Sequence, residues 1–106
     1  MNFEQLSPGE LQQHLAGENP PFLLDVREAW EFEICHIPGS QHIPMERVPA
    51  SLERLPRERD IVLICHHGLR SQQVGIYLQR MGFSVLNLTG GVAAWAEQID
   101  PGMPRY

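Results

Sequence analysis

The segment 61–81 constrains the fold more than any other stretch of the 106-residue chain. Residues 61–64 are all apolar and mostly β-branched, and the run is too short for a helix, so it predicts a buried strand. Residues 71–81 carry apolar side chains at helical spacing. Cys65 therefore follows a strand, on a loop that leads into a helix. In α/β proteins this edge of the sheet is where ligands usually bind.

Cys65 is the candidate nucleophile of this loop. The start of a helix offers unpaired N–H groups and the positive end of its dipole, which favour anions and lower the pKa of a thiol. We therefore expect a thiolate that faces an anionic substrate. The predicted substrate-binding residues share this loop, because their amides form an anion cradle, and they are His66, His67, Gly68, Leu69, Arg70 and Ser71. Gly68 lets the loop curl, and Arg70 presents a planar fork to an oxyanion.

Strand and helix patterns alternate along the rest of the chain. Further strands are predicted at 22–26, 41–43 and 84–88. Helices are predicted at 7–17, 28–34 and 92–98, with a weak helix at 45–55 that Pro49 interrupts. This alternation predicts one α/β domain over 1–106, with a mostly parallel central sheet of about five strands and helices on both faces. Trp30 and Trp95 are the expected core anchors, and the breaker-rich residues 100–106 are expected to form a loose tail.

The composition narrows the functional classes. The chain carries a net charge of −5, and its eight basic residues are all arginine, so lysine-based Schiff chemistry is excluded. The acidic balance argues against nucleic acid as a partner. There is no leader pattern at the start and no apolar run of membrane-spanning length, so we expect a cytoplasmic protein with free thiols and no membrane contact.

Four motifs follow one another along nearly the whole chain: LDVRE at 24–28, HIPGS at 36–40, CHHGLRS at 65–71 and LTGGVAAW at 88–95. In this order they resemble the single-domain rhodanese sulfurtransferases. The resemblance implies the rhodanese fold and a Cys65 that cycles between thiol and persulfide. A small anionic donor such as thiosulfate would pass its outer sulfur to Cys65, and a thiophilic acceptor such as cyanide or a thiol would remove it. No cofactor is implied.

The loop length separates two related kinds of enzyme. Phosphatases that resemble this fold space the nucleophile and arginine as Cys-x5-Arg, whereas Arg70 gives Cys-x4-Arg and Ser71 fills the phosphatase position. This spacing points to sulfur transfer. Two residues depart from the family pattern. His66 stands where many members carry arginine, and Cys35 stands where glycine is usual.

Supporting roles are expected outside the loop. Asp25 and Arg27 should brace the strand edge as an ion pair, His36 should bond its own turn, and Gly90 and Gly91 should let the backbone approach a neighbour closely.

Several alternatives stay open. Cys65 could be an inert core thiol, and Cys35 could resolve the persulfide as a disulfide. The adjacent Cys and His residues do not have the spacing of a zinc site, so we expect no metal. A module that relays persulfide from, or docks onto, a protein partner, with little turnover of small donors, is the second functional hypothesis, and His66 favours it.

Overall fold

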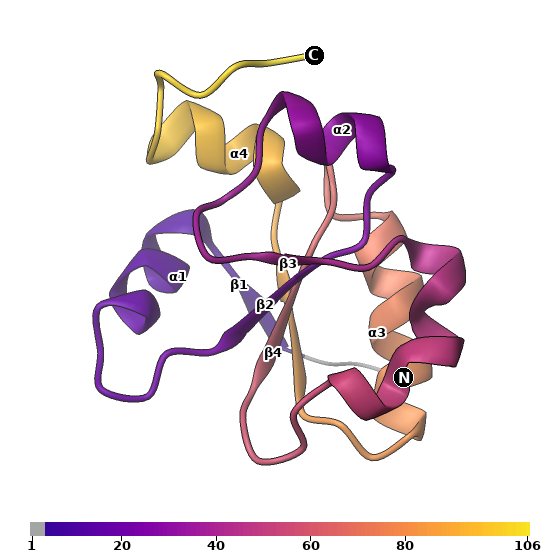
Figure 1. Cartoon of the computed structure of the whole chain (residues 1–106). Helices are drawn as coiled ribbons and strands as arrows, with labels where there is room; N and C mark the ends of the chain where they lie inside the picture. Colours follow the sequence, from indigo (N-terminus) through magenta and orange to yellow (C-terminus); the bar gives the residue numbers. More distant parts are fainter. Residues whose placement is uncertain (1–3) are drawn as a thin grey trace.

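A five-stranded sheet forms the centre of the computed structural model, which describes residues 4–106 (Figure 1). The strands lie in the order β1-β5-β4-β2-β3, and every neighbouring pair is parallel. They are β1 (Glu4–Leu6), β2 (Phe22–Asp25), β3 (Gln41–His42), β4 (Ile61–Ile64) and β5 (Val85–Leu88). The helices are α1 (Pro8–Leu15), α2 (Ala29–Ile34), the 3₁₀ segment η1 (Met45–Arg54), α3 (Arg70–Arg80) and α4 (Gly91–Gln98). The predicted α/β class and parallel sheet are confirmed.

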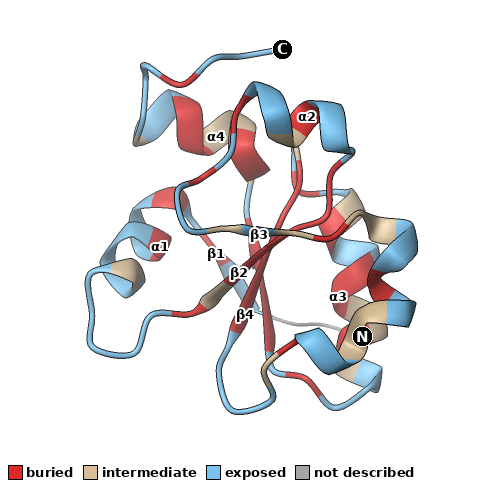
Figure 2. Ribbon diagram, in the orientation of Figure 1, coloured by how far each residue is buried: buried red, intermediate tan, exposed pale blue. Residues whose placement is uncertain are grey.

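The central strand β4 is buried on both faces, which explains its uniformly apolar sequence (Figure 2). Because side chains alternate along a strand, Val62 and Ile64 pack in the half of the core that includes α1 and α4. Ile61 and Leu63 pack in the other half, which includes α3 and η1. Cys65 continues this alternation and joins the α3 half.

Local signals in the sequence explain where several elements begin and end. The Ser7 hydroxyl accepts from the Glu10 amide at 3.1 Å, and the Glu10 carboxylate accepts from the Ser7 amide at 2.9 Å, so the capping box that starts α1 is complete. Gly39 has φ +87° in the turn before β3. Pro49 lies inside η1, where the 3₁₀ conformation replaces the weak α-helix expected there.

Strand β1 was not predicted. It has three residues, only Leu6 among them is buried, and its single neighbour is β5 at the edge of the sheet. A strand this short shows no alternation that a sequence pattern could reveal.

Two expectations about burial are wrong. Trp30 is 55% exposed and contacts the ring of Tyr106, whereas Trp95 is a core residue as predicted. The buried side of α2 instead carries Glu31. The tail is not loose either, because Met103 is buried and the Tyr106 hydroxyl donates to Glu31 at 2.8 Å.

None of the helices within residues 4–106 is long and apolar enough to cross a membrane. The expectation that the chain has no leader rests partly on residues 1–3, which lie outside the described residues.

Candidate active site

The thiol of Cys65 lies at the carboxyl end of β4, inside the loop that leads to α3. Its Sγ accepts a hydrogen bond from the Gly68 amide at 2.9 Å and a longer one from the Ser71 amide at 3.5 Å. The Ser71 hydroxyl is 3.3 Å from the same sulfur. The residue is 1% exposed, but it lines a cavity of about 260 Å³. The cavity is lined by Glu31, Cys65, His66, His67, Leu69 and Arg70.

The start of α4 fixes the orientation of this loop. The Val92 amide donates to the Cys65 carbonyl at 2.8 Å, and the Ala93 amide donates to the His66 carbonyl at 3.0 Å. With these carbonyls held towards α4, the Gly68 and Ser71 amides reach the sulfur. Gly91 has φ +58°, and a Cβ there would collide with the Cys65 carbonyl oxygen. The close backbone approach expected at the glycine pair is therefore present at Gly91.

A chain of polar groups supports the loop from β5. The Ser71 hydroxyl donates to Asn87 Oδ1, so its oxygen is free to accept the proton of the Cys65 thiol. Asn87 Nδ2 donates to Gln5 Oε1 at 2.9 Å and to the Gly68 carbonyl at 3.4 Å. Asn87 was missed as a site residue, although an amide inside a buried strand is itself a signal, since buried polar groups need partners.

Arg70 forms an ion pair that the sequence did not predict. Its Nη1 and Nη2 donate to the two carboxylate oxygens of Glu31 at 2.6 and 2.7 Å. This bidentate bond raises the pKa of Arg70, and it lowers the pKa of Glu31 to about 2. The Glu28 amide and the Tyr106 hydroxyl also donate to the Glu31 carboxylate, each at 2.8 Å. The predicted oxyanion receptor is thus already engaged.

The Asp25–Arg27 ion pair braces the strand edge as predicted. Both side chains are fully buried, and Arg27 Nη2 lies 2.7 Å from Asp25 Oδ2. Arg27 also donates to the Cys35 carbonyl at 2.6 Å and to the Tyr106 hydroxyl at 2.9 Å. Burial is the largest single influence on Arg27 and opposes its charge, but the hydrogen bonds and charges of Asp25 and Tyr106 together outweigh burial and raise the pKa of Arg27. The pair thus links the end of β2 to α2 and to the tail.

His66 and His36, two of the histidines predicted to belong to the site, differ in their surroundings. Burial lowers the pKa of His66, and the neighbouring His67 acts in the same direction. The His66 ring packs 4.4 Å from the ring of Tyr106, and its Nδ1 is buried with no partner among the described residues. His36 Nδ1 bonds to the Phe32 carbonyl at 2.9 Å and its ring stacks on Phe32, so its geometry fits the expected structural role.

The two cysteines lie in different halves of the core. Cys35 packs in the half that includes α1 and α4, and Cys65 in the half that includes α3. Both thiols are free. Their packing in different halves of the core gives no support to the alternative in which Cys35 resolves a Cys65 persulfide. Among residues 4–106, no three His, Cys, Asp or Glu side chains are grouped to hold a metal ion.

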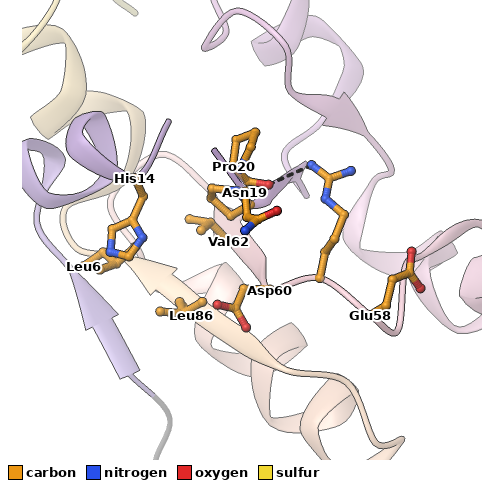
Figure 3. A pocket seen from close by; sticks show the side chains of 10 residues that line it. Leu6, His14, Asn19, Pro20, Glu58, Asp60, Val62 and Leu86 are labelled. Carbon is orange, nitrogen blue, oxygen red and sulfur yellow. Dashed lines mark hydrogen bonds between the residues drawn. The ribbon is translucent and has the colours of Figure 1, made fainter. Parts of the chain in front are cut away.

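A larger hollow of about 420 Å³ lies elsewhere, at the amino end of the parallel strands (Figure 3). Asp60, which precedes β4, and His14 of α1 lie on its rim, and Leu6, Val62 and Leu86 are among its lining residues. Since Cys65 follows the opposite end of β4, this hollow is not part of the thiol site.

Comparison with known proteins identifies relatives along nearly the whole chain. Residues 7–98 match the family model of the rhodanese-like domain. The chain is 34% identical over 101 residues to the protein YtwF of Bacillus subtilis, covering 95% of this chain and 98% of that one. It is 36% identical over 98 residues to a sulfurtransferase of Allochromatium vinosum, covering 92% of each.

Solved structures agree with this result. A protein from Staphylococcus saprophyticus superposes with a TM-score of 0.85 at 31% identity, over 92% of this chain and 97% of that one. Some relatives are longer, and the chain spans about a quarter of their length.

Proposed function

The chain belongs to the rhodanese-like family, and from this premise we propose that it transfers sulfane sulfur through a persulfide on Cys65. One observation carries the proposal. Cys65 Sγ accepts hydrogen bonds from two main-chain N–H groups at the N-terminus of α3, and Cys65 lines a cavity. Such donors stabilise negative charge on a sulfur, both in the thiolate and in the persulfide that follows it.

The proposed reaction has two displacement steps at sulfur. The Cys65 thiolate attacks the outer sulfur of thiosulfate, the S–S bond of the donor breaks, and sulfite leaves with the bonding electron pair. An acceptor such as cyanide or a thiolate then attacks the outer sulfur of the persulfide. The Cys65 S–S bond breaks, the thiolate returns, and the products are thiocyanate or a new persulfide. The cycle needs no oxidant, reductant or cofactor.

The loop residues supply the binding groups in this proposal. The amides of Gly68 and Ser71 hold the charged sulfur, and Arg70 lies in the cavity wall, where it would have to leave Glu31 to meet the oxyanion of a donor. Ser71 takes part through its hydroxyl, because it can rotate from Asn87 to donate to the thiolate.

A second candidate is a persulfide relay that exchanges sulfur with a protein partner and turns over small donors poorly. The observation that favours it is the bidentate Arg70–Glu31 pair, since an engaged arginine binds a small oxyanion less well. His66 in place of the arginine common in the family removes a second cation from the same loop.

Intact mass spectrometry after thiosulfate treatment tests the persulfide. We expect a gain of about 32 Da in the wild-type protein and in Cys35→Ala, and no gain in Cys65→Ala. A gain that persists in Cys65→Ala would overturn the assignment.

Steady-state thiosulfate:cyanide kinetics separate the two candidates. Turnover that disappears in Cys65→Ala supports the enzyme. Negligible turnover, together with persulfide acquired only from a protein donor, supports the relay.

A further inference from the structure

The carboxylate of Glu31 lines the same cavity as the candidate nucleophile. Its side chain is only 5% exposed, and four hydrogen bonds hold it: two from Arg70, one from the Tyr106 hydroxyl and one from the Glu28 amide. A group with this many donors has little freedom to turn away. It is a fixed negative charge in the wall of the site.

This carboxylate cancels the one permanent cation of the cavity wall. Arg70 uses both terminal nitrogens on Glu31, so it can bind a donor oxyanion only by leaving the carboxylate. Leaving would strand a nearly buried charge without its main partner, which is unfavourable. The other lining groups that can titrate are Cys65 itself, His67 and His66, and burial disfavours the charged form of His66.

The rim of the cavity suits an organic group better than a sulfonate. Leu69 lines the cavity and is 72% exposed. This side chain offers apolar surface to the part of a donor that carries the sulfur.

We propose that Glu31 is a specificity-determining residue that makes the site select persulfides of organic thiols over the thiosulfate dianion. The inference rests on the proposed sulfur transfer and names the donor class. An organic persulfide brings a single charge at the sulfur, which the Gly68 and Ser71 amides accommodate. Thiosulfate brings a second, sulfonate charge, which Glu31 repels and which Arg70 is not free to receive.

The reaction of Cys65 with two alkylating agents tests the charge of the cavity without any sulfur transfer. Iodoacetamide is neutral and iodoacetate is an anion of similar size. The measured quantity is the ratio of the alkylation rate with iodoacetamide to the rate with iodoacetate. We expect this ratio to be about tenfold higher for Cys65 of the wild-type protein than for mercaptoethanol, because one partly screened charge contact changes a rate by about that factor. A preference equal to that of mercaptoethanol would overturn the proposal, and this measurement needs no variant.

Glu31→Gln tests the same residue by kinetics, with Glu33→Gln as the matched control. Glu33 lies on the same helix and is exposed, so its replacement removes the same charge away from the cavity. In Glu31→Gln we expect kcat/KM for thiosulfate to rise about tenfold, while kcat/KM for the persulfide of mercaptoethanol changes less than about twofold. Equal changes for both donors, or an equal thiosulfate effect in Glu33→Gln, would refute the role of Glu31.

The failure of the proposed function would look different. In that case Cys65 would gain no sulfur from either donor, whereas the alkylation preference would remain measurable.

Discussion

Replacing Asp25 with alanine should destabilise the fold more than any surface change, because it strands a buried arginine. Arg27 directs its backbone amide, Nε and Nη2 to the Asp25 carboxylate at 2.7 to 3.0 Å, and both side chains are fully buried. Removing one partner of a buried ion pair usually costs about 3–5 kcal/mol. Arg27 would keep its bonds to the Cys35 carbonyl and the Tyr106 hydroxyl. We therefore expect the free energy of unfolding of Asp25→Ala to fall by about 3 kcal/mol, the lower end of this range.

The assay is urea unfolding followed by tryptophan fluorescence, together with a thermal melt. A loss of about 3 kcal/mol corresponds to a fall in Tm of about 10–20 °C for a domain of this size. Asp25→Asn keeps an acceptor oxygen and should lie between wild type and Asp25→Ala. Asp60→Ala removes an exposed carboxylate that accepts from Ser84, and we expect it to cost less than about 1 kcal/mol. If Asp25→Ala cost no more than Asp60→Ala, the buried pair would not be the brace that the geometry indicates.

Three further predictions follow from burial and charge. The pKa of Glu31 is lowered from 4.5 to about 2 in the folded protein, so its ionised form stabilises the fold above pH 4.5 and this contribution is lost as the pH falls towards 2. The Tm of wild type should therefore fall more steeply over that range than the Tm of Glu31→Gln, and parallel curves would contradict this. Gly91→Ala would bring a Cβ against the carbonyl oxygen of Cys65. We therefore expect the free energy of unfolding to fall by about 2 kcal/mol and iodoacetamide to alkylate Cys65 more slowly. Gly9→Ala is the control, because a Cβ there meets nothing within 4 Å, and we expect it to leave the alkylation rate of Cys65 unchanged. In chemical denaturation, we expect Trp30→Ala to lower the free energy of unfolding by less than about 1 kcal/mol and Trp95→Ala to lower it by about 3–5 kcal/mol. The reverse order would contradict the exposure of the Trp30 ring and the burial of the Trp95 ring.

The centre of the site could be predicted because its signals are local. Four apolar residues before Cys65 are enough to predict β4, and helical spacing after it predicts α3. Gly68 has φ +94°, a backbone conformation that favours glycine, which agrees with the expectation that this residue lets the loop curl. Asp25 and Arg27 were paired correctly because residues two apart at a strand end remain neighbours whatever the rest of the fold does.

The group formed by Arg70, Glu31 and Tyr106 could not be predicted because its members come from distant parts of the chain. Glu31 lies 39 residues before Arg70, and Tyr106 lies 75 residues after Glu31. Hydrophobicity alone places Trp30 inside, but the buried position on α2 belongs to Glu31, whose carboxylate binds Arg70. Once Arg70 and Arg27 lie beneath α2, the carboxylate takes the inner position and the indole is left outside.

The packing of Cys35 and Cys65 in different halves of the core has a consequence for how sulfur leaves the protein when other thiols are present. Because Cys35 and Cys65 belong to different halves of the core, we expect a sulfur held on Cys65 to pass to an outside acceptor rather than to Cys35. Each round must therefore end in a collision with another molecule, and the rate of discharge will follow the concentration of outside thiols. By the same reasoning, a sulfenic acid formed on Cys65 should condense with a thiol of another molecule rather than with Cys35, which would prevent oxidation to the irreversible sulfinic acid.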